Sequence, residues 1–438
     1  MRVRVPEALA RATFPPPLLE LLRTLGEAGH RSWLVGGAVR DLLLARQRTA
    51  DDYDVATPAT PAEVKALFRK VVPTGEAHGT VTVLLGGHSF EVTTFRGEGA
   101  YADGRRPESV TFHADLEADL ARRDFTMNAL AYDPLGGDFR DPFGGRADLA
   151  ARRVRAVGDP AARFGEDGLR ALRAVRFAAQ LGYRLEAATR RAIPGALDVV
   201  RKVSRERVAD ELVRLLVAPD ATRGLALARA TGLLEVILPA LAARPVAELR
   251  HAARTVARVP PSPELRLAGL LHALRADEVE ELLLALRLSR RLAVEAAALV
   301  RAHACRLAAG ADALPSTPER VRRWLAAAGP ARAGALLALA EGDARALPPR
   351  QRARRSVEAQ NLQALAADVL REAPPLTADA LALDGRAVMQ LLGAGPGPHV
   401  GEALRVLLDR VLADPRENDP ERLAEVLRLW WAGRARPL

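Results

Sequence analysis

The chain has 438 residues, of which 27% are charged, and a formal net charge of +10. Its length allows about two to four domains with cores of their own, and no apolar run is long enough to span a bilayer. The N-terminal segment lacks the apolar core of a signal peptide, and the single cysteine, Cys305, excludes an intrachain disulfide and a cysteine-rich zinc site. We therefore expect a cytoplasmic protein. The basic charge favours a polyanionic partner, although a GC-rich genome would explain the excess of arginine equally well.

Hydrophobic periodicity predicts an α+β fold, with mixed elements in the first third of the chain and helices alone after Phe143. Arginine- and leucine-rich helices begin at Arg163 and are broken by glycine and proline. The predicted strands and helices of the first third are Ser32–Val35 (strand), Ala38–Ala45 (helix), Asp52–Ala56 (strand), Pro61–Phe68 (helix), His78–Leu85, Ser89–Phe95, Ser109–His113 and Ala129–Tyr132 (strands).

Proline-containing breaks divide the helical part near residues 218–220, 259–263 and 347–350. A basic run, RQRARRS, follows the last break at Arg350–Ser356. We interpret this run as a solvated linker more readily than as a dedicated RNA clamp.

The segment Leu34–Thr57 joins a Gly-Gly turn and a helix to two aspartates at positions i and i+2. On a strand, Asp52 and Asp54 point to the same face, while Tyr53 points to the other. Two carboxylates on one face suit Mg²⁺ ions that bridge triphosphate oxygens, and a glycine turn at a helix N-terminus offers N–H groups to phosphate. Each half alone is common in proteins, but together they indicate nucleotidyl transfer.

Two further segments carry charged residues in suggestive patterns. In LARRDFTMNAL, two arginines precede Asp124, which can instead cap or orient the following turn. In RFGEDGLRALRAVRF, Asp167, Arg170, Arg173 and Arg176 recur every three residues, so they would drift around one side of a helix. A surface helix with one ion pair is the plainer explanation of the second segment.

Glu91 lies in the alternating strand FEVTTF and becomes a third site carboxylate if that strand neighbours the strand of Asp54. The polar, glycine-rich segment Arg96–Val110 follows, and its composition is typical of a mobile loop beside an active site.

In order and spacing, LVGGAVRDLL, DYDVAT, EAHGTVTV, FEVTTFR, RRDFTMNALAYD, DPFGGRADL and RFGEDGLRALRAVRF resemble the class II tRNA nucleotidyltransferase and bacterial poly(A) polymerase family. The strong resemblance covers residues 33–185 and continues loosely to the C-terminal segment ALDGRAVMQLLGAGPGPHVGEAL. It implies four parts: a nucleotidyltransferase head with a mixed sheet (1–145), a helical neck with a nucleotide-selecting helix (146–217), a helical body (218–347) and an RNA-binding helical tail (348–438).

The resemblance also implies roles for particular residues. Asp52 and Asp54 would hold two Mg²⁺ ions, with Glu91 as a third catalytic carboxylate. The nucleotide-binding residues would be Gly36, Gly37, Arg40, Arg123, Asp167, Arg170, Arg173 and Arg176. Asp167 and Arg170 match the element that reads the incoming base. A carboxylate and a guanidinium satisfy the edges of both C and A, whereas G and U present the opposite pattern.

The implied activity is addition of C, C and A to the 3′ end of tRNA from CTP and ATP. The segment HGTVT resembles the CCA-adding members more than the poly(A) polymerases. Addition of A alone, poly(A) synthesis and, remotely, a non-catalytic RNA-binding protein remain alternatives. Some relatives carry a His-Asp phosphohydrolase domain, but Leu271-His272-Ala273 lacks the required pair, so we expect no hydrolase and an ordinary core or surface histidine there.

Overall fold

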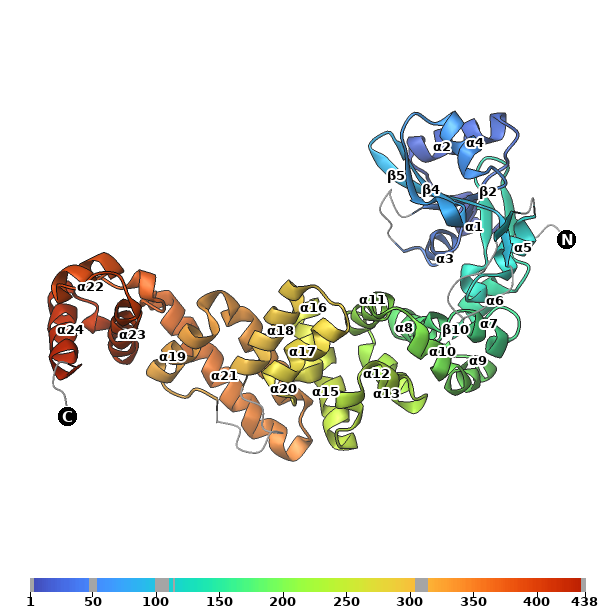
Figure 1. The fold of residues 1–438 in the computed structure, drawn as a ribbon. Helices are drawn as coiled ribbons and strands as arrows, with labels where there is room; N and C mark the ends of the chain where they lie inside the picture. Colours follow the sequence, from blue (N-terminus) through green and yellow to red (C-terminus); the bar gives the residue numbers. More distant parts are fainter. Residues whose placement is uncertain (1–3, 47–52, 99–109, 113–114, 304–313, 435–438) are drawn as a thin grey trace. The chain divides into compact units, whose positions relative to one another are not determined.

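A computed structural model describes residues 4–46, 53–98, 110–112, 115–303 and 314–434. These residues form two compact units, residues 1–239 and 240–438, which are described separately below. The first unit contains every strand of the described chain, and the second consists of helices (Figure 1). The predicted α+β class is confirmed. None of the described helices has the length and apolar character that a membrane-spanning segment needs.

The head of the first unit is built on a seven-stranded mixed sheet with the order β3-β4-β5-β2-β1-β8-β9. Only β2 and β5 pair in parallel; the other neighbours in this sheet are antiparallel. Two short two-stranded sheets, β6-β7 and β10-β11, complete the strands. The bounds are β1 (Trp33–Val35), β2 (Asp54–Thr57), β3 (Val71–Gly75), β4 (Thr80–Leu85), β5 (His88–Thr94), β6 (Arg96–Glu98), β7 (Val110–Phe112), β8 (Ala131–Asp133), β9 (Asp138–Arg140), β10 (Arg153–Val154) and β11 (Arg184–Leu185).

Helices and 3-10 turns connect these strands and continue beyond them to the end of the unit. In chain order they are α1 (Glu7–Ala10), α2 (Pro16–Glu27), α3 (Gly37–Leu43), α4 (Pro61–Leu67), η1 (Glu76–His78), α5 (Leu116–Ala121), η2 (Thr126–Asn128), α6 (Gly145–Ala150), α7 (Pro160–Glu166), α8 (Leu169–Leu181), α9 (Ala187–Ala192), η3 (Pro194–Ala196), α10 (Leu197–Lys202), α11 (Arg205–Leu216), α12 (Ala221–Ala230) and α13 (Leu233–Ile237).

Local sequence explains where several of these elements begin. Thr60 caps α4 by accepting a hydrogen bond from the Glu63 N–H, and the Glu63 side chain accepts one from the Thr60 N–H in return. The Asp159 side chain caps α7 by accepting a hydrogen bond from the Ala162 N–H, and proline stands at the first position of both helices. Such caps satisfy N–H groups that the first helical turn leaves without partners.

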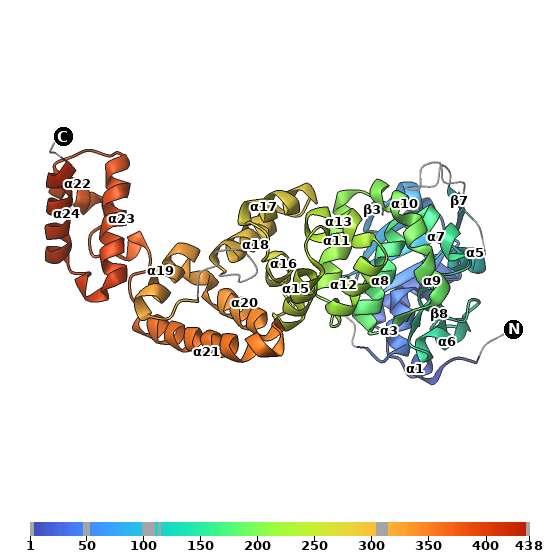
Figure 2. The same ribbon diagram turned by 90° about the horizontal axis from the view of Figure 1, so that it is seen from below.

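The core of the head lies between the sheet and the segments that follow it. Trp33, Val35, Ala56 and Ala131 contribute side chains from three neighbouring strands, and Leu120 and Val157 cover them from outside the sheet. Helix α8 packs against both α11 and α12 (Figure 2). Within the sheet, β2 pairs with β1 on one side and with β5 on the other, so these three strands lie next to one another.

The second unit is entirely helical in its described residues. Its helices are α14 (Pro239–Ala242, shared with the first unit), α15 (Val246–Arg258), α16 (Pro263–Leu271), α17 (Ala276–Ala285), α18 (Arg290–Ala302), α19 (Pro318–Ala328), η4 (Pro330–Arg332), α20 (Ala333–Ala346), α21 (Pro349–Glu372), η5 (Ala378–Ala380), α22 (Gly385–Leu392), α23 (Pro398–Ala413), η6 (Pro415–Glu417) and α24 (Pro420–Arg434). One core cluster centres on α19–α21 and another on α22–α24.

Several sequence predictions need correction. The basic run Arg350–Ser356 is not a linker, because it forms the start of the 24-residue helix α21. Strands β3, β6 and β9 and helices α1, α2 and α5 were not predicted, and short strands do occur after Phe143. The predicted breaks do coincide with helix ends, but the four-part division of the chain stays a prediction. Of the predicted strand Ser109–His113, the structure describes residues 110–112 as β7.

Gly168, which lies between α7 and α8, packs tightly against the backbone of α10, and this contact can be tested. A Cβ atom at Gly168 would lie 2.5 Å from the backbone nitrogen of Val200, whereas one at Gly165, inside α7, would meet nothing within 4 Å. We expect Gly168→Ala to destabilise the protein by about 1–3 kcal/mol through overpacking. Gly165→Ala, the matched control, should be neutral or stabilising by up to about 1 kcal/mol, since alanine favours helix. Thermal unfolding of the full chain measures both, and equal midpoints for the two variants would contradict the close contact.

Candidate nucleotide-transfer site

Two carboxylates meet where strands β2 and β5 run side by side. Asp54, the first residue of β2, pairs in register with Glu91 on β5, and both residues are exposed. The conditional prediction that Glu91 neighbours the aspartate strand is therefore confirmed. Asp52 lies outside the described residues, as does most of the predicted loop Arg96–Val110.

The glycine turn lies directly beside this pair. Val35 at the end of β1 is the register partner of Asp54, and Gly36 follows it with a φ of +69°, a value that favours glycine. A Cβ at Gly36 would lie 2.8 Å from Arg123 Nη1 and 3.7 Å from Asp54 Oδ2. The structure thus brings Gly36, Asp54 and Arg123 together, and Gly37 begins α3 next to them.

The two predicted arginines of the head are placed differently. Arg123 is partly exposed and donates to Asp119 Oδ2 at 3.2 Å, while its buried Nε has no hydrogen-bond partner among the described residues. Arg40 is buried; it forms an ion pair with Asp41 and donates to Asn128 Oδ1 at 2.7 Å. Arg123 therefore faces the glycine turn, whereas the buried Arg40 contacts Asp41 and Asn128 in the interior of the head.

The predicted base-reading pair does not share one helix, because α7 ends at Glu166 and α8 begins at Leu169. Asp167 lies in the break between them in extended conformation, with φ −148° and ψ 106°. The expectation that Asp167 belongs to the same helical row as the arginines is wrong. The next residue, Gly168, lies so close to α10 that a Cβ atom there would be 2.5 Å from the Val200 nitrogen.

Hydrogen bonds orient both members of this pair. Asp167 Oδ1 accepts from the Leu169 N–H at 3.0 Å, and Asp167 Oδ2 accepts from Arg207 Nη2 at 2.7 Å. Arg170 donates to the backbone oxygen of Arg122 at 3.0 Å and forms an ion pair with Glu166. Arg207, on α11, was not among the predicted site residues. Arg207 lies in the segment SRERVADEL, residues 204–212, and no motif or spacing in the sequence predicts its contact with Asp167.

Arg173 and Arg176 belong to a buried ion-pair network instead of an open surface. Arg173 Nε donates to Asp124 Oδ2 at 2.8 Å, and Arg173 Nη1 lies 3.4 Å from Glu211 Oε1. Arg176 Nε donates to Glu211 Oε2 at 2.7 Å, with both side chains almost fully buried. Glu211, like Arg207, was not among the site residues predicted from the sequence.

Asp124 orients the turn that follows it, as the capping interpretation of the sequence proposed. Its Oδ1 accepts from the Phe125 N–H at 2.8 Å and from Asn128 Nδ2 at 2.9 Å. Burial raises the pKa of Asp124, but the charge of Arg173 and these hydrogen bonds outweigh it and lower the pKa to about 2. Asp124 is therefore ionised at neutral pH although it is buried.

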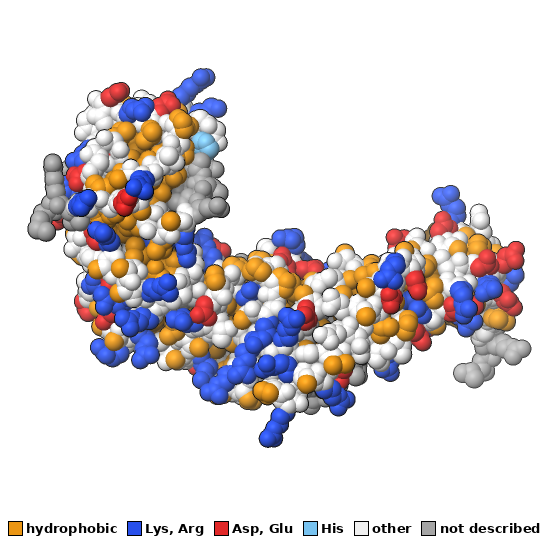
Figure 3. Space-filling model, turned by 180° about the vertical axis from the view of Figure 1, so that it is seen from behind, with side chains coloured by type: hydrophobic (Ala, Val, Ile, Leu, Met, Phe, Trp, Pro, Cys, Tyr) orange, Lys and Arg blue, Asp and Glu red, His pale blue; other side chains and the backbone are white. Residues whose placement is uncertain are grey.

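An arginine cluster lies on the second unit. Arg254 and Arg258 on α15 stand near Arg345 on α20 and Arg352 on α21, and burial together with these charges lowers the pKa of Arg258. Among the described residues, no carboxylate forms an ion pair with Arg254, Arg258 or Arg352. Figure 3 shows Lys and Arg side chains gathered on this part of the chain. Uncompensated arginines of this kind favour binding of phosphate groups.

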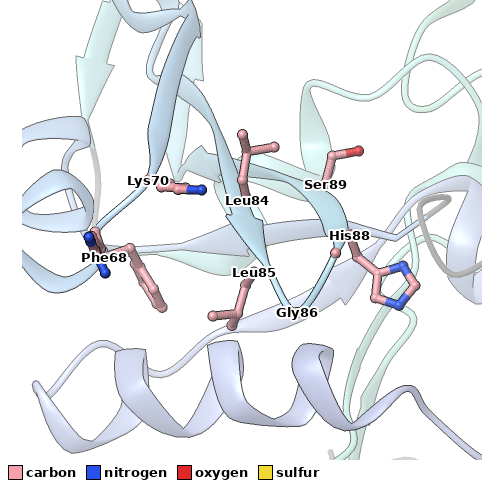
Figure 4. Close-up of a pocket in the computed structure, with 9 residues that line it drawn as sticks. Phe68, Lys70, Leu84, Leu85, Gly86, His88 and Ser89 are labelled. Atoms are coloured by element: carbon pink, nitrogen blue, oxygen red, sulfur yellow. The ribbon is translucent and has the colours of Figure 1, made fainter.

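A pocket of about 490 Å³ opens at the turn between β4 and β5 (Figure 4). Lys70, Leu84, Leu85, His88 and Ser89 contribute to its lining. None of the predicted site residues lines it, so it is separate from the carboxylate pair.

The donor set on strands β2 and β5 suits magnesium. Carboxylate oxygens are the ligands that Mg²⁺ prefers, and Asp54 and Glu91 present them side by side at the surface. Carboxylates, a glycine turn and an arginine on neighbouring strands of a mixed sheet are together the parts of a nucleotidyl-transfer site.

Comparisons with known proteins agree with this class of site. The family described as "Poly A polymerase head domain" matches residues 32–155, and "Probable RNA and SrmB- binding site of polymerase A" matches residues 182–244. The chain is 39% identical to the CCA-adding enzyme of Geobacillus thermodenitrificans over 92% of this chain and 94% of the relative. It is 38% identical to that of Geobacillus stearothermophilus over 93% and 96%.

Solved structures of CCA-adding enzymes also match this chain. A crystal structure of the Bacillus stearothermophilus CCA-adding enzyme in complex with CTP matches with a TM-score of 0.76 and 35% identity, covering 96% of this chain and 99% of that one. The Thermotoga maritima CCA-adding enzyme complexed with tRNA shares the fold, with a TM-score of 0.62, 20% identity and coverage of 98% and 99%. The chain belongs to the class II CCA-adding enzyme and poly(A) polymerase family.

The buried Asp124 predicts an acid-dependent loss of stability. Because its folded pKa of about 2 lies below the ordinary value of 3.8, ionised Asp124 stabilises the fold by about 2 kcal/mol above pH 4. This stabilisation is lost as the pH falls from about 4 towards 2. Denaturant unfolding at about pH 6 and pH 3 should show the parent's advantage over Asp124→Asn shrinking in acid. Asp198→Asn, which alters an exposed ion pair, is the control and should stay within about 0.5 kcal/mol of the parent at both pH values.

Proposed function

We propose that this chain is a CCA tRNA nucleotidyltransferase that uses the head site to add C, C and A to the 3′ end of tRNA from CTP and ATP. The observation that carries the proposal is the in-register pair of Asp54 and Glu91 beside Gly36 and Arg123. The close relatives named CCA-adding enzymes support the choice of product. The family's solved structures with CTP, ATP or tRNA support the choice of substrates.

In this reaction the 3′-hydroxyl oxygen of the tRNA attacks the α-phosphorus of the nucleotide. The new O–P bond forms as the bond to the bridging oxygen breaks, and pyrophosphate leaves with the electron pair of that bond. The hydroxyl proton passes to Glu91 or to water. Gly36, Gly37 and Arg123 bind the triphosphate through backbone N–H groups and a guanidinium, which orients the α-phosphate for in-line attack.

Asp54 and Asp52, with Glu91 beside them, would hold the Mg²⁺ ions. When bound, Mg²⁺ neutralises charge that develops on the phosphate oxygens. Arg40 acts from behind the triphosphate site, since its contacts with Asp41 and Asn128 fix the position of α3.

Asp167 and Arg170 select the base of the incoming nucleotide. The Asp167 carboxylate accepts from the exocyclic amine of C or A, and the Arg170 guanidinium donates to a ring nitrogen or carbonyl oxygen. Arg207, whose side chain is 42% exposed, holds Asp167 until a base takes its place. Arg173 and Arg176 position this pair from within the ion-pair network and make no base contact of their own.

The arginine cluster of the second unit supports tRNA as the polyanionic partner, because guanidinium groups pair with phosphates without reading sequence. We infer the cytoplasm as the compartment, because tRNA substrates are found there and because a single cysteine fits a compartment in which disulfides are rare. The four-part division into head, neck, body and tail remains part of this proposal.

The first test uses labelled CTP or ATP, Mg²⁺ and tRNAs that end before CCA, after the first C or after CC. The proposal predicts completion of all three to CCA. Incorporation of A alone on the CC-ending tRNA would identify an A-adding enzyme, and long A tails on unrelated RNA a poly(A) polymerase. No incorporation on any substrate would leave an RNA-binding protein.

In this assay Asp54→Asn should lower incorporation by about 10²-fold or more, because it removes a charged ligand from the reaction centre. Binding of the tRNA should stay within about threefold of the parent, since the site carboxylates repel phosphate rather than attract it. Glu20→Gln, an exposed carboxylate on α2, is the matched control and should keep full activity. Full activity of Asp54→Asn would remove the carboxylate pair from the mechanism.

Asp167→Ala should relax base choice. Loss of the acceptor for the exocyclic amine should raise UTP incorporation relative to CTP by at least about tenfold, with little change in the thermal unfolding midpoint. Asp210→Ala alters an exposed carboxylate on α11, the helix that carries Arg207, and should leave the ratio unchanged. An unchanged UTP to CTP ratio in Asp167→Ala would refute the assigned role.

A further inference from the structure

A buried group of three histidines and one aspartate lies inside the second unit. His251 belongs to α15, His272 follows α16, His303 follows α18 and Asp343 belongs to α20. Their exposed fractions are 5%, 2%, 8% and 3%. We call these four residues the histidine cluster. Viewed alone, His272 was expected to be an ordinary core or surface histidine, and the sequence gives no sign that four helices bring these side chains together.

The imidazole nitrogens converge on the Asp343 carboxylate. His251 Nε2 lies 2.6 Å from Asp343 Oδ1, and His272 Nε2 lies 3.6 Å from the same oxygen. His303 Nε2 lies 3.6 Å from Asp343 Oδ2. The ring centroids of His251 and His272 are 5.3 Å apart, and those of His272 and His303 are 5.7 Å apart. Donor atoms of His251, His272 and Asp343 all lie within 4.8 Å of one another.

Several of these nitrogens have no hydrogen-bond partner among the described residues. They are His251 Nδ1, His272 Nε2 and His303 Nε2, all completely shielded from solvent. A buried polar atom without a partner is costly, and a native fold rarely leaves three of them in one place. Such a group therefore calls for a ligand that satisfies several nitrogens at once.

The tautomer of His272 narrows the identity of that ligand. His272 Nδ1 lies 2.8 Å from the backbone oxygen of Gly269, which can only accept, so Nδ1 carries the proton. In a neutral ring, Nε2 then presents its lone pair towards the Asp343 carboxylate. Two electron-rich atoms face each other across 3.6 Å, and a cation between them removes the repulsion. A backbone oxygen that receives the second ring N–H is also the usual support of a metal-binding histidine.

We propose that the histidine cluster binds one divalent transition-metal ion of the zinc type through His272 Nε2, Asp343 and one nitrogen of His251, the three residues whose donor atoms already lie close together. Imidazole nitrogens together with a carboxylate suit zinc, and they do not suit Mg²⁺, which prefers oxygen ligands. Donor atoms on a tetrahedral zinc ion lie about 3.3 Å apart, close to the 3.6 Å between His272 Nε2 and Asp343 Oδ1. His303 Nε2 lies 3.6 Å from the other Asp343 oxygen and is a neighbour of the ligand set. His251 exchanges its hydrogen bond to Asp343 for the metal.

The three ligands are almost fully buried, so the ion is closed to a nucleic-acid substrate and has a structural role. It ties α15, α20 and the chain segment after α16 to one point within the second unit. This role is independent of the nucleotide-transfer site, which lies in the first unit.

Metal content of the full-length protein tests this site directly. The untagged chain is stripped with chelator, returned to buffer with excess Mg²⁺ to occupy the head carboxylates, and titrated with Zn²⁺. We expect about one tightly bound Zn²⁺ per chain and a higher unfolding temperature with zinc than without. Co²⁺ should give the intense visible absorption of a four-coordinate ion. Absence of tight Zn²⁺ binding by the parent would overturn the proposal.

Variants locate the bound ion. His272→Gln and Asp343→Asn should each abolish the tight site and the zinc-dependent rise in unfolding temperature, while His30→Gln, a histidine of the first unit, should change neither. Tight binding of Zn²⁺ that survives His272→Gln and Asp343→Asn would place the ion elsewhere and contradict the assignment. If a variant fails to fold, the cobalt spectrum of the parent still decides, because octahedral absorption would exclude the proposed ligand set.

Discussion

Asp124 lies buried where the turn of the head meets helix α8, and its two carboxylate oxygens serve different partners. One oxygen accepts from Asn128 and the Phe125 N–H, and the other accepts from Arg173. Asn128 in turn accepts from Arg40. A single charge thus connects α3, which follows the glycine turn, to α8, the helix beside the proposed base-reading residues. Removing one partner of such a buried pair typically costs about 3–5 kcal/mol, which is a large share of a domain's stability.

This network extends beyond Asp124 to Glu211 on α11, which binds both Arg173 and Arg176. The same helix supplies Arg207 to Asp167. One face of α11 therefore holds the positions of Asp167, the proposed base-reading aspartate, and of the arginines on α8. Arg173 and Arg176, which the sequence pattern placed at the nucleotide, both form ion pairs with carboxylates, and their contact with a nucleotide stays a prediction.

Local patterns in the sequence predicted those parts of the site that depend on chain neighbours. The turn at Gly36, the strand of Asp54 and the alternating strand of Glu91 each follow from a few adjacent residues, and parallel pairing of two strands then places the carboxylates together. Asp167 was misplaced because the three-residue spacing of the charges does not show the break before α8, where the Asp167 carboxylate accepts from the Leu169 N–H. Arg207, Glu211 and the histidine cluster were missed because each depends on helices that meet only in the folded protein.

The two aspartate–arginine pairs of the first unit differ in their access to solvent. The side chains of Asp124 and Arg173 are 9% and 30% exposed, whereas those of Asp167 and Arg207 are 19% and 42% exposed. Dissolved salt screens the attraction between exposed charges, with a Debye length of about 10 Å at 0.1 M, and acts much less on buried pairs. Rising ionic strength therefore weakens the pair of Arg207 and Asp167 more than the pair of Arg173 and Asp124. Under the proposed role of Asp167, nucleotide choice then responds to salt concentrations that leave the fold intact.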